Sequence, residues 1–186
     1  GVTGPFLGLL TAEAGATVIK IEPPEGDWSR KLAPETSTGN SALYESFNRN
    51  KKSITIDLET KDGQSKLREI IRKADVLIED WGPDAAEKRN LGYQQLCVDN
   101  PKLIYLALSP FGEKGPLRDR PGSELITQAF TAYLRTLGEV NEDPVRVGAD
   151  VSSTVTAGMA FISLLAALYY RLKNGEGQRV STSQLG

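Results

Sequence analysis

One carboxylate, Asp150, stands in a sequence context that would let it react with a substrate. It follows a short strand-like stretch at residues 144–149 and precedes the small residues of 151–161, which lead into a long apolar helix. Small side chains around a carboxylate at the mouth of a helix leave room for a substrate, so nucleophilic chemistry is open to it. Aspartate is also a favoured helix N-cap, and capping alone accounts for a carboxylate at this position. Both interpretations stay open on position alone.

The residue types that are missing restrict the chemistry further. The 186 residues include no histidine and one cysteine, Cys97. A Ser-His-Asp triad, a Cys-His dyad, a histidine-ligated metal site and a thiolate metal cluster are therefore excluded within this chain. Proton transfer has to use carboxylates, lysine, tyrosine or the substrate itself. The sequence thus predicts carboxylate chemistry and no metal.

Composition argues against several classes of partner. The net charge of −2 gives no electrostatic reason to expect nucleic acid or an acidic membrane surface. A lone cysteine fits a reducing compartment, and we expect the cytoplasm, or an organelle matrix in a eukaryote. The apolar run from Val155 to Tyr170 is shorter than the about 20 residues that a spanning helix needs. We expect this run to form a buried or interface helix.

Strand and helix patterns alternate along the chain, which predicts an α/β fold with a Rossmann-like parallel sheet covered by helices on both faces. A loop rich in Pro, Gly and Ser at 23–40 resembles a lid or binding loop. The expected strands are 17–22, 53–57, 75–79, 102–109 and 178–181, and the expected helices are 5–14, 60–73, a short one from Pro83, 93–98, 123–137 and 150–172.

Several residues have a structural and a functional interpretation at once. Ser123 and Glu124 suit the N-cap and first turn of a helix. Trp81 follows a strand, where α/β proteins bind ligands, but a tryptophan at a strand end also suits a core. The basic cluster of Arg49, Lys51 and Lys52 would neutralise phosphates, or would simply lie in solvent.

Longer strings carry a family resemblance. The chain resembles the family III CoA-transferases in several segments. These are NRNKKSITIDL at 48–58, FGEKGPLRDRPG at 111–122, and GAD with the AAL-x-x-R and G-x-G-Q-x-V segments that follow it. The resemblance implies an acyl-CoA donor, a small carboxylic acid acceptor, CoA as cosubstrate with no resident cofactor, and an interlocked homodimer. It also implies that residues 1–186 are the N-terminal part of a large CoA-binding Rossmann-like domain. The domain's first strand, whose absence leaves an unpaired edge, and a small C-terminal domain would lie outside this chain.

The resemblance also implies roles for individual residues. Asp150 corresponds to the nucleophile, which forms an aspartyl anhydride and then aspartyl-CoA, and Glu124 lies near the reacting carbonyl. The related acyl-CoA racemases use a histidine where this chain has Ser123, which argues against racemisation. Two alternatives remain, a racemase with another base and a non-catalytic acyl-CoA-binding protein. The residues expected at the CoA site are Val2, Thr3, Ile56, Asp80, Trp81, Ala85, Lys88 and Arg89.

Overall fold

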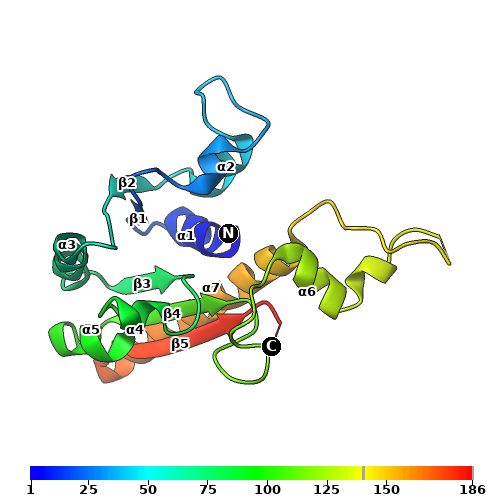
Figure 1. Ribbon diagram of the computed structural model, residues 1–186. Helices are drawn as coiled ribbons and strands as arrows, with labels where there is room; N and C mark the ends of the chain where they lie inside the picture. The colour runs from blue at the N-terminus through cyan, green and yellow to red at the C-terminus, as the bar shows by residue number, and fades with distance from the viewer. Residues whose placement is uncertain (140, 186) are drawn as a thin grey trace.

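The computed structural model describes residues 1–139 and 141–185 and contains two parallel sheets (Figure 1). One sheet pairs β1 (Ile19–Glu22) with β2 (Lys52–Thr55). The other has the order β3-β4-β5, formed by β3 (Val76–Glu79), β4 (Ile104–Ser109) and β5 (Gln178–Ser183). Within the described residues β1 pairs only with β2, and β3 only with β4. The parallel strands confirm the predicted α/β class, but they divide into two sheets.

Helices cover both faces of the three-stranded sheet, as predicted. On one face lie α1 (Thr3–Glu13) and α7 (Val151–Asn174), which pack on the β4 side chains Ile104, Leu106 and Leu108. On the opposite face lie α3 (Lys61–Ile71), α4 (Ala85–Lys88) and α5 (Tyr93–Asp99), around Tyr105 and Ala107 of β4. Successive β4 side chains therefore enter two different cores, which explains its continuous apolar sequence.

The long helix α7 has one buried and one exposed face. Ala157, Ala160 and Leu164 are buried against the sheet. Large apolar side chains on its other face are exposed, namely Val155, Met159, Ile162, Leu165, Tyr169, Tyr170 and Leu172. Within residues 1–139 and 141–185, α7 alone is long and apolar enough to cross a membrane, a test that core helices of soluble proteins also pass. Its packing on β4 is that of a core helix, so the prediction of a buried helix is correct for one face.

The segment between β4 and α7 differs most from expectation. The predicted helix 123–137 ends early, because α6 spans Glu124–Phe130 and Ala132 then takes a left-handed conformation with φ 56° before the 3₁₀ turn η2 (Tyr133–Arg135). The strand-like stretch 144–149 forms no strand. Alternating apolar residues need a neighbouring strand to pair with, and this segment projects away from both sheets with α6 (Figure 1).

Helix ends follow local sequence signals in most places. Thr60 Oγ1 accepts from Gly63 N at 3.1 Å and caps α3, and Gly175 with φ 78° ends α7. The short helix expected from Pro83 begins two residues later, after the left-handed Asp84. Two elements were not predicted: the 3₁₀ turn η1 (Trp28–Lys31) and the helix α2 (Ala42–Asn48), both near the 23–40 loop.

Candidate functional site

A cavity of about 310 Å³ lies at the carboxyl ends of β1, β2 and β3. Residues after β1, after β2 and after β3 all contribute to its wall, as expected of a ligand site in an α/β fold. Three residues predicted to bind CoA meet there, namely Ile56, Trp81 and Arg89. The full lining is Ile21, Glu22, Pro23, Pro24, Glu25, Ile56, Asp57, Leu58, Glu59, Trp81 and Arg89. We call this the nucleotide cavity, after the part of CoA that the family resemblance leads us to expect at these residues.

Trp81 and Arg89 form one corner of the nucleotide cavity. The Arg89 guanidinium lies 6.0 Å from the centre of the indole ring, at the outer limit of a cation–π contact. Its Nη2 also donates to Glu59 Oε1 at 2.7 Å, and its Nη1 to the carbonyl of Ala85 at 3.1 Å. An aromatic face beside a guanidinium can hold an adenine ring and a phosphate together. Lys88, by contrast, is exposed on α4 and does not line this cavity.

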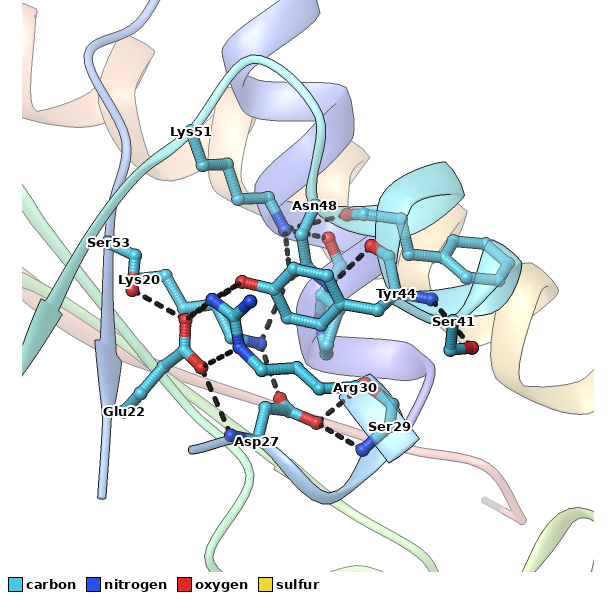
Figure 2. Close-up of polar contacts among 12 residues, drawn as sticks. Lys20, Glu22, Asp27, Ser29, Arg30, Ser41, Tyr44, Asn48, Lys51 and Ser53 are labelled. Carbon is cyan, nitrogen blue, oxygen red and sulfur yellow. Dashed lines mark hydrogen bonds and ion pairs between the residues drawn. The ribbon is translucent and has the colours of Figure 1, made fainter. Parts of the chain in front are cut away.

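Glu22, another residue of the cavity wall, is at the centre of an ionic network (Figure 2). Arg30 donates to both Glu22 oxygens, at 2.7 and 2.9 Å, and the Tyr44 hydroxyl and Ser53 hydroxyl donate to Oε1 at 2.8 and 2.5 Å. Burial alone would raise the pKa of Glu22, but these hydrogen bonds outweigh it and hold the pKa well below its usual range. The network fastens the 23–40 loop to β1, so this part of the predicted lid is anchored.

The basic cluster beside β2 does not face the cavity. Lys51 Nζ donates to the carbonyls of Pro5 and Phe47, at 2.6 and 2.8 Å, and to Asn48 Oδ1 at 3.1 Å (Figure 2). Burial and the nearby Lys20 ammonium lower the pKa of Lys51 to about 7. Lys51 therefore ties α1 to α2, which is the structural interpretation of this residue.

At the start of α7, the cap is supplied by Glu124 instead of Asp150. Asp150 occupies the N-cap position but makes no side-chain capping bond. Glu124 Oε1 accepts from Ser152 N at 2.8 Å, and Oε2 accepts from Ser153 N at 2.9 Å. Both serine hydroxyls also donate to Oε2, at 2.6 and 2.8 Å. Burial would raise the pKa of Glu124, but these bonds and one from Gln128 lower it to about 2.

Gln128, one turn after Glu124 on α6, holds the chain on the other side of Asp150. Its amide oxygen accepts from Val147 N at 3.2 Å, and its nitrogen donates to the Ala149 carbonyl at 3.3 Å. The side chain is 1 % exposed. Gln128 was not among the residues predicted from the sequence, although its i+4 spacing from Glu124 places the two on one helix face.

The Asp150 carboxylate itself is bonded lightly. Its Oδ1 accepts from Arg146 Nη2 at 3.2 Å, and its side chain keeps 25 % of its surface exposed. It lies outside the nucleotide cavity and outside a second cavity beside it, described below. The capping interpretation weighed above is thus wrong for the Asp150 side chain, and one carboxylate oxygen has no hydrogen-bond partner among the described residues.

The remaining predicted residues gather near the start of α1. Val2 and Thr3 are buried, and Thr3 Oγ1 accepts from Gln184 Nε2 at 3.0 Å. Gln184 Nε2 also donates to Ser153 Oγ at 3.0 Å, which links the start of α1 to the start of α7. The Asp80 carboxylate lies against Gly4, where an added Cβ would be 2.8 Å from Oδ2. Asp80 therefore faces α1 and not the indole side of the turn.

The predicted site is thus divided between the nucleotide cavity and the start of α7, with the start of α1 beside the latter. Ala85 joins the first part through its carbonyl bond to Arg89, and Glu124 joins the second. Within residues 1–139 and 141–185, no cluster of three or more His, Cys, Asp or Glu residues is arranged to hold a metal ion.

Comparison with known proteins gives a consistent result over the whole chain. Residues 1–186 match CoA-transferase family III. The chain is 37 % identical to succinate–glutarate CoA-transferase from Agrobacterium fabrum, covering 99 % of this chain and 48 % of that protein. It is 37 % identical to succinyl-CoA–D-citramalate CoA-transferase from Chloroflexus aurantiacus, covering 96 % and 45 %.

A solved structure agrees with these relatives. The crystal structure of a CaiB/BaiF family protein from Brucella suis superposes with a TM-score of 0.92 at 32 % identity, over 98 % of this chain and 49 % of that one. The chain spans about half the length of the relatives it matches. It belongs to CoA-transferase family III, as the sequence motifs indicated.

Proposed function

We propose that this chain carries the nucleotide site and the nucleophile of a CoA-transferase, which moves CoA from an acyl-CoA donor to a small carboxylic acid. Family membership and the activities of the named relatives support this proposal. Those relatives are named for succinate, glutarate and citramalate, so acids of this kind are the acceptors to test first. Acyl-CoA acts as a cosubstrate, and no resident cofactor is part of the proposal.

The nucleotide cavity is the proposed site of the adenosine end of CoA. Adenine stacks on Trp81, above the apolar surface of Ile56, while Arg89 neutralises a phosphate. Lys88, exposed on the neighbouring turn of α4, adds positive charge at the edge. The start of α1 lies beside the start of α7, so the backbone N–H groups of Val2 and Thr3 offer hydrogen-bond donors to the part of CoA that approaches Asp150.

In the proposed reaction, an Asp150 oxygen attacks the thioester carbonyl of the donor. The C–S bond breaks, CoA leaves as the thiolate, and an acyl-aspartyl anhydride remains. The thiolate then attacks the aspartyl carbonyl, which forms aspartyl-CoA and releases the first acid. The carboxylate of the second acid repeats both exchanges in reverse, so no proton has to be transferred. Glu124 stays ionised and fixes the segment beside Asp150.

One observation supports Asp150 as the nucleophile above the others. Glu124 satisfies the first N–H groups of α7, so the Asp150 carboxylate is not engaged in capping. The carboxylate is partly exposed, and Arg146 is its one ionic partner in the described part of the chain. A carboxylate at this position can approach a thioester without breaking the helix cap.

The experiment is mass spectrometry of the protein after incubation with a panel of acyl-CoAs. We expect a covalent adduct on the peptide that carries Asp150, and loss of both adduct and exchange in Asp150→Ala. Glu69→Gln, an exposed change on α3, is the matched control and should keep both. Full exchange by Asp150→Ala would refute the nucleophile. An adduct mapped to Glu124, Ser153 or another residue would move the nucleophile while keeping the transferase.

A second candidate, acyl-CoA binding without transfer, is favoured by one observation. Asp150 lies outside the nucleotide cavity and is paired with Arg146, so the cavity can bind CoA without engaging it. In this case calorimetry would detect CoA binding, with no adduct and no exchange for any acyl-CoA in the panel.

The proposal includes a homodimer in a reducing compartment, the cytoplasm or an organelle matrix. The exposed apolar face of α7, which includes Val155, Met159, Ile162 and Tyr169, is a surface that a stable protein covers. A second copy of the chain or the remaining part of the protein would cover it. Light scattering of the purified protein distinguishes a dimer from a monomer.

A further inference from the structure

The turn after β3 sends three consecutive side chains to three different places. Trp81 lines the nucleotide cavity, and the Asp80 carboxylate lies against Gly4 of α1. Glu79 lines a second cavity, of about 290 Å³, on the other side of the turn. Gly82 and Pro83 also line this second cavity. The short turn that carries the Trp81 indole is therefore also part of the wall of the second cavity.

Glu79 holds this turn through its side chain. Its Oε2 accepts from the backbone N–H of Trp81 at 2.9 Å, and its Oε1 accepts from the Tyr105 hydroxyl at 3.4 Å. The residue is 6 % exposed, and within the described residues it has no ion-pair partner. The two guanidinium groups that line this cavity are paired elsewhere, Arg179 with Glu113 and Arg118 with Asp84. Glu79 is thus a buried carboxylate without a cation, a costly arrangement, and it stands beside the backbone N–H of Trp81.

We infer that Glu79 is a positioning residue for CoA binding, because its carboxyl group fixes the backbone of Trp81 and with it the orientation of the indole in the nucleotide cavity. The inference rests on the proposed function, in which adenine stacks on Trp81. A stacking platform contributes most when its orientation is set before the ligand arrives. Loss of the Glu79 bond leaves the N–H of Trp81 without its partner and frees the turn.

The charges around Glu79 make this role sensitive to pH. Burial raises the pKa of Glu79 to about 7, and Asp80 of the same turn and Glu87 of α4 raise it too, while the Trp81 N–H bond and Arg179 of β5 lower it. Tyr105 of β4 faces it as a neutral donor. Both forms of Glu79 are therefore populated near neutral pH. The ionised form is the stronger acceptor for the Trp81 N–H, so we expect tighter CoA binding as the pH rises from 6 to 8.

The test measures the dissociation constant of CoA by calorimetry, and kcat and KM for an acyl-CoA, at pH 6, 7 and 8. We expect Glu79→Leu to weaken CoA about tenfold, the effect of one lost hydrogen bond of ordinary strength, and to raise KM with little change in kcat. Glu79→Gln keeps an acceptor for the Trp81 N–H and should restore most of the affinity. Glu79→Gln should also make the dissociation constant of CoA less dependent on pH than in the wild type. The comparison with the wild type corrects for titration of CoA itself.

Controls separate the possible failures. Glu87→Gln, which changes a carboxylate in the same second cavity without a bond to Trp81, should leave affinity unchanged at pH 8, where Glu79 is mostly ionised in both proteins. Trp81→Ala with unchanged affinity would refute the stacking role in the proposed function. Weaker binding by Trp81→Ala together with normal binding by Glu79→Leu would overturn the positioning role alone. If Glu79→Leu does not fold, a wild-type pH dependence in Glu79→Gln would overturn it.

A spectroscopic measurement adds a direct readout. The chain has two tryptophans, so Trp28→Phe isolates the emission of Trp81. In that background, we expect Glu79→Leu to increase acrylamide quenching of Trp81, and Glu79→Gln to restore the original value. Identical quenching in all three proteins would contradict the proposed fixing of the indole.

Discussion

The substitution Glu124→Gln tests the account of how α7 begins. The Glu124 carboxylate accepts two backbone N–H groups, two serine hydroxyls and the Gln128 amide, with distances between 2.6 and 2.9 Å. Glutamine has nearly the same shape but replaces one oxygen with an N–H₂ group, which donates. At least one of the two backbone N–H groups then faces a donor, and an unsatisfied buried N–H group costs about 1–3 kcal/mol.

The pKa of Glu124, which reflects the same hydrogen bonds, gives a second magnitude. A fall from the ordinary value of 4.5 to about 2 corresponds to about 3 kcal/mol of unfolding free energy at neutral pH. Solvent reaches part of this side chain, and screening reduces the figure to about 2 kcal/mol. The two magnitudes agree, so we expect Glu124→Gln to lower the unfolding free energy at pH 7 by about 2 kcal/mol.

The pH dependence identifies the origin of this loss. The folded pKa is depressed, so the stabilisation is fully present above the unfolded value of 4.5 and is lost as the pH falls towards about 2. The difference between wild type and Glu124→Gln should therefore be constant from pH 7 to about 6 and fall to about half near pH 3.

Urea unfolding of both proteins between pH 7 and pH 3 makes this measurement, with Glu69→Gln on the exposed side of α3 as the control. A difference that stays constant down to pH 3 would mean that shape and packing, and not charge, explain the effect. No difference at pH 7 would refute the capping role of Glu124.

Three further predictions concern other parts of the molecule. Glu79→Gln should raise the unfolding free energy by up to about 3 kcal/mol at pH 8 and by little at pH 4. The raised pKa of Glu79 stabilises the fold fully only below the unfolded pKa of 4.5, and this stabilisation is lost as the pH rises through about 7. Urea unfolding of both proteins at pH 8 and pH 4 checks the prediction. Arg30→Met should weaken CoA binding and expose the 23–40 loop to protease, because it leaves the buried Glu22 without its cation. Calorimetry and limited proteolysis that both give wild-type results would show that Arg30 does not hold the loop. Ile162→Lys should shift light scattering from dimer to monomer if a second copy covers α7, and an unchanged mass would argue against that partner.

The nucleotide cavity was the part of the site most accessible to prediction from sequence. Trp81 follows a strand, and parallel strands bring their carboxyl ends to one edge, so a residue there can line a cavity at that edge whatever the details of packing. Arg89 follows from the same rule, because a short helix returns it to that edge. The orientation of Asp80 towards Gly4 did not follow, because it depends on the twist of a single turn.

The start of α7 was predictable in outline only. An aspartate before a helix is a cap in most sequences, and nothing local to Asp150 indicates that Glu124 takes over this role from another helix. The replacement depends on how α6 lies against α7, which is a tertiary contact with no signal in the spacing of either helix. The role of Gln128 could not be predicted for the same reason, because its amide holds residues 147 and 149 only once that segment has folded against α6.

The separation of the site into two parts itself bears on the choice of ligand. The nucleotide cavity places one indole, that of Trp81, and one guanidinium, that of Arg89, in a wall that also holds carboxylates, while the start of α7 offers Asp150 among small and polar side chains. A small metabolite would bind at one of these two places and make no contact with the other. Acyl-CoA joins an adenine nucleotide to a thioester through a long pantetheine arm, so the proposed function gives a role to both places. The start of α1 lies next to the start of α7, because Thr3 and Ser153 share Gln184 as a hydrogen-bond partner. Under the proposed function, the nucleotide lies at one edge and the reacting carboxylate at a helix start, an arrangement that suits a ligand that is long, flexible and reactive at one end only.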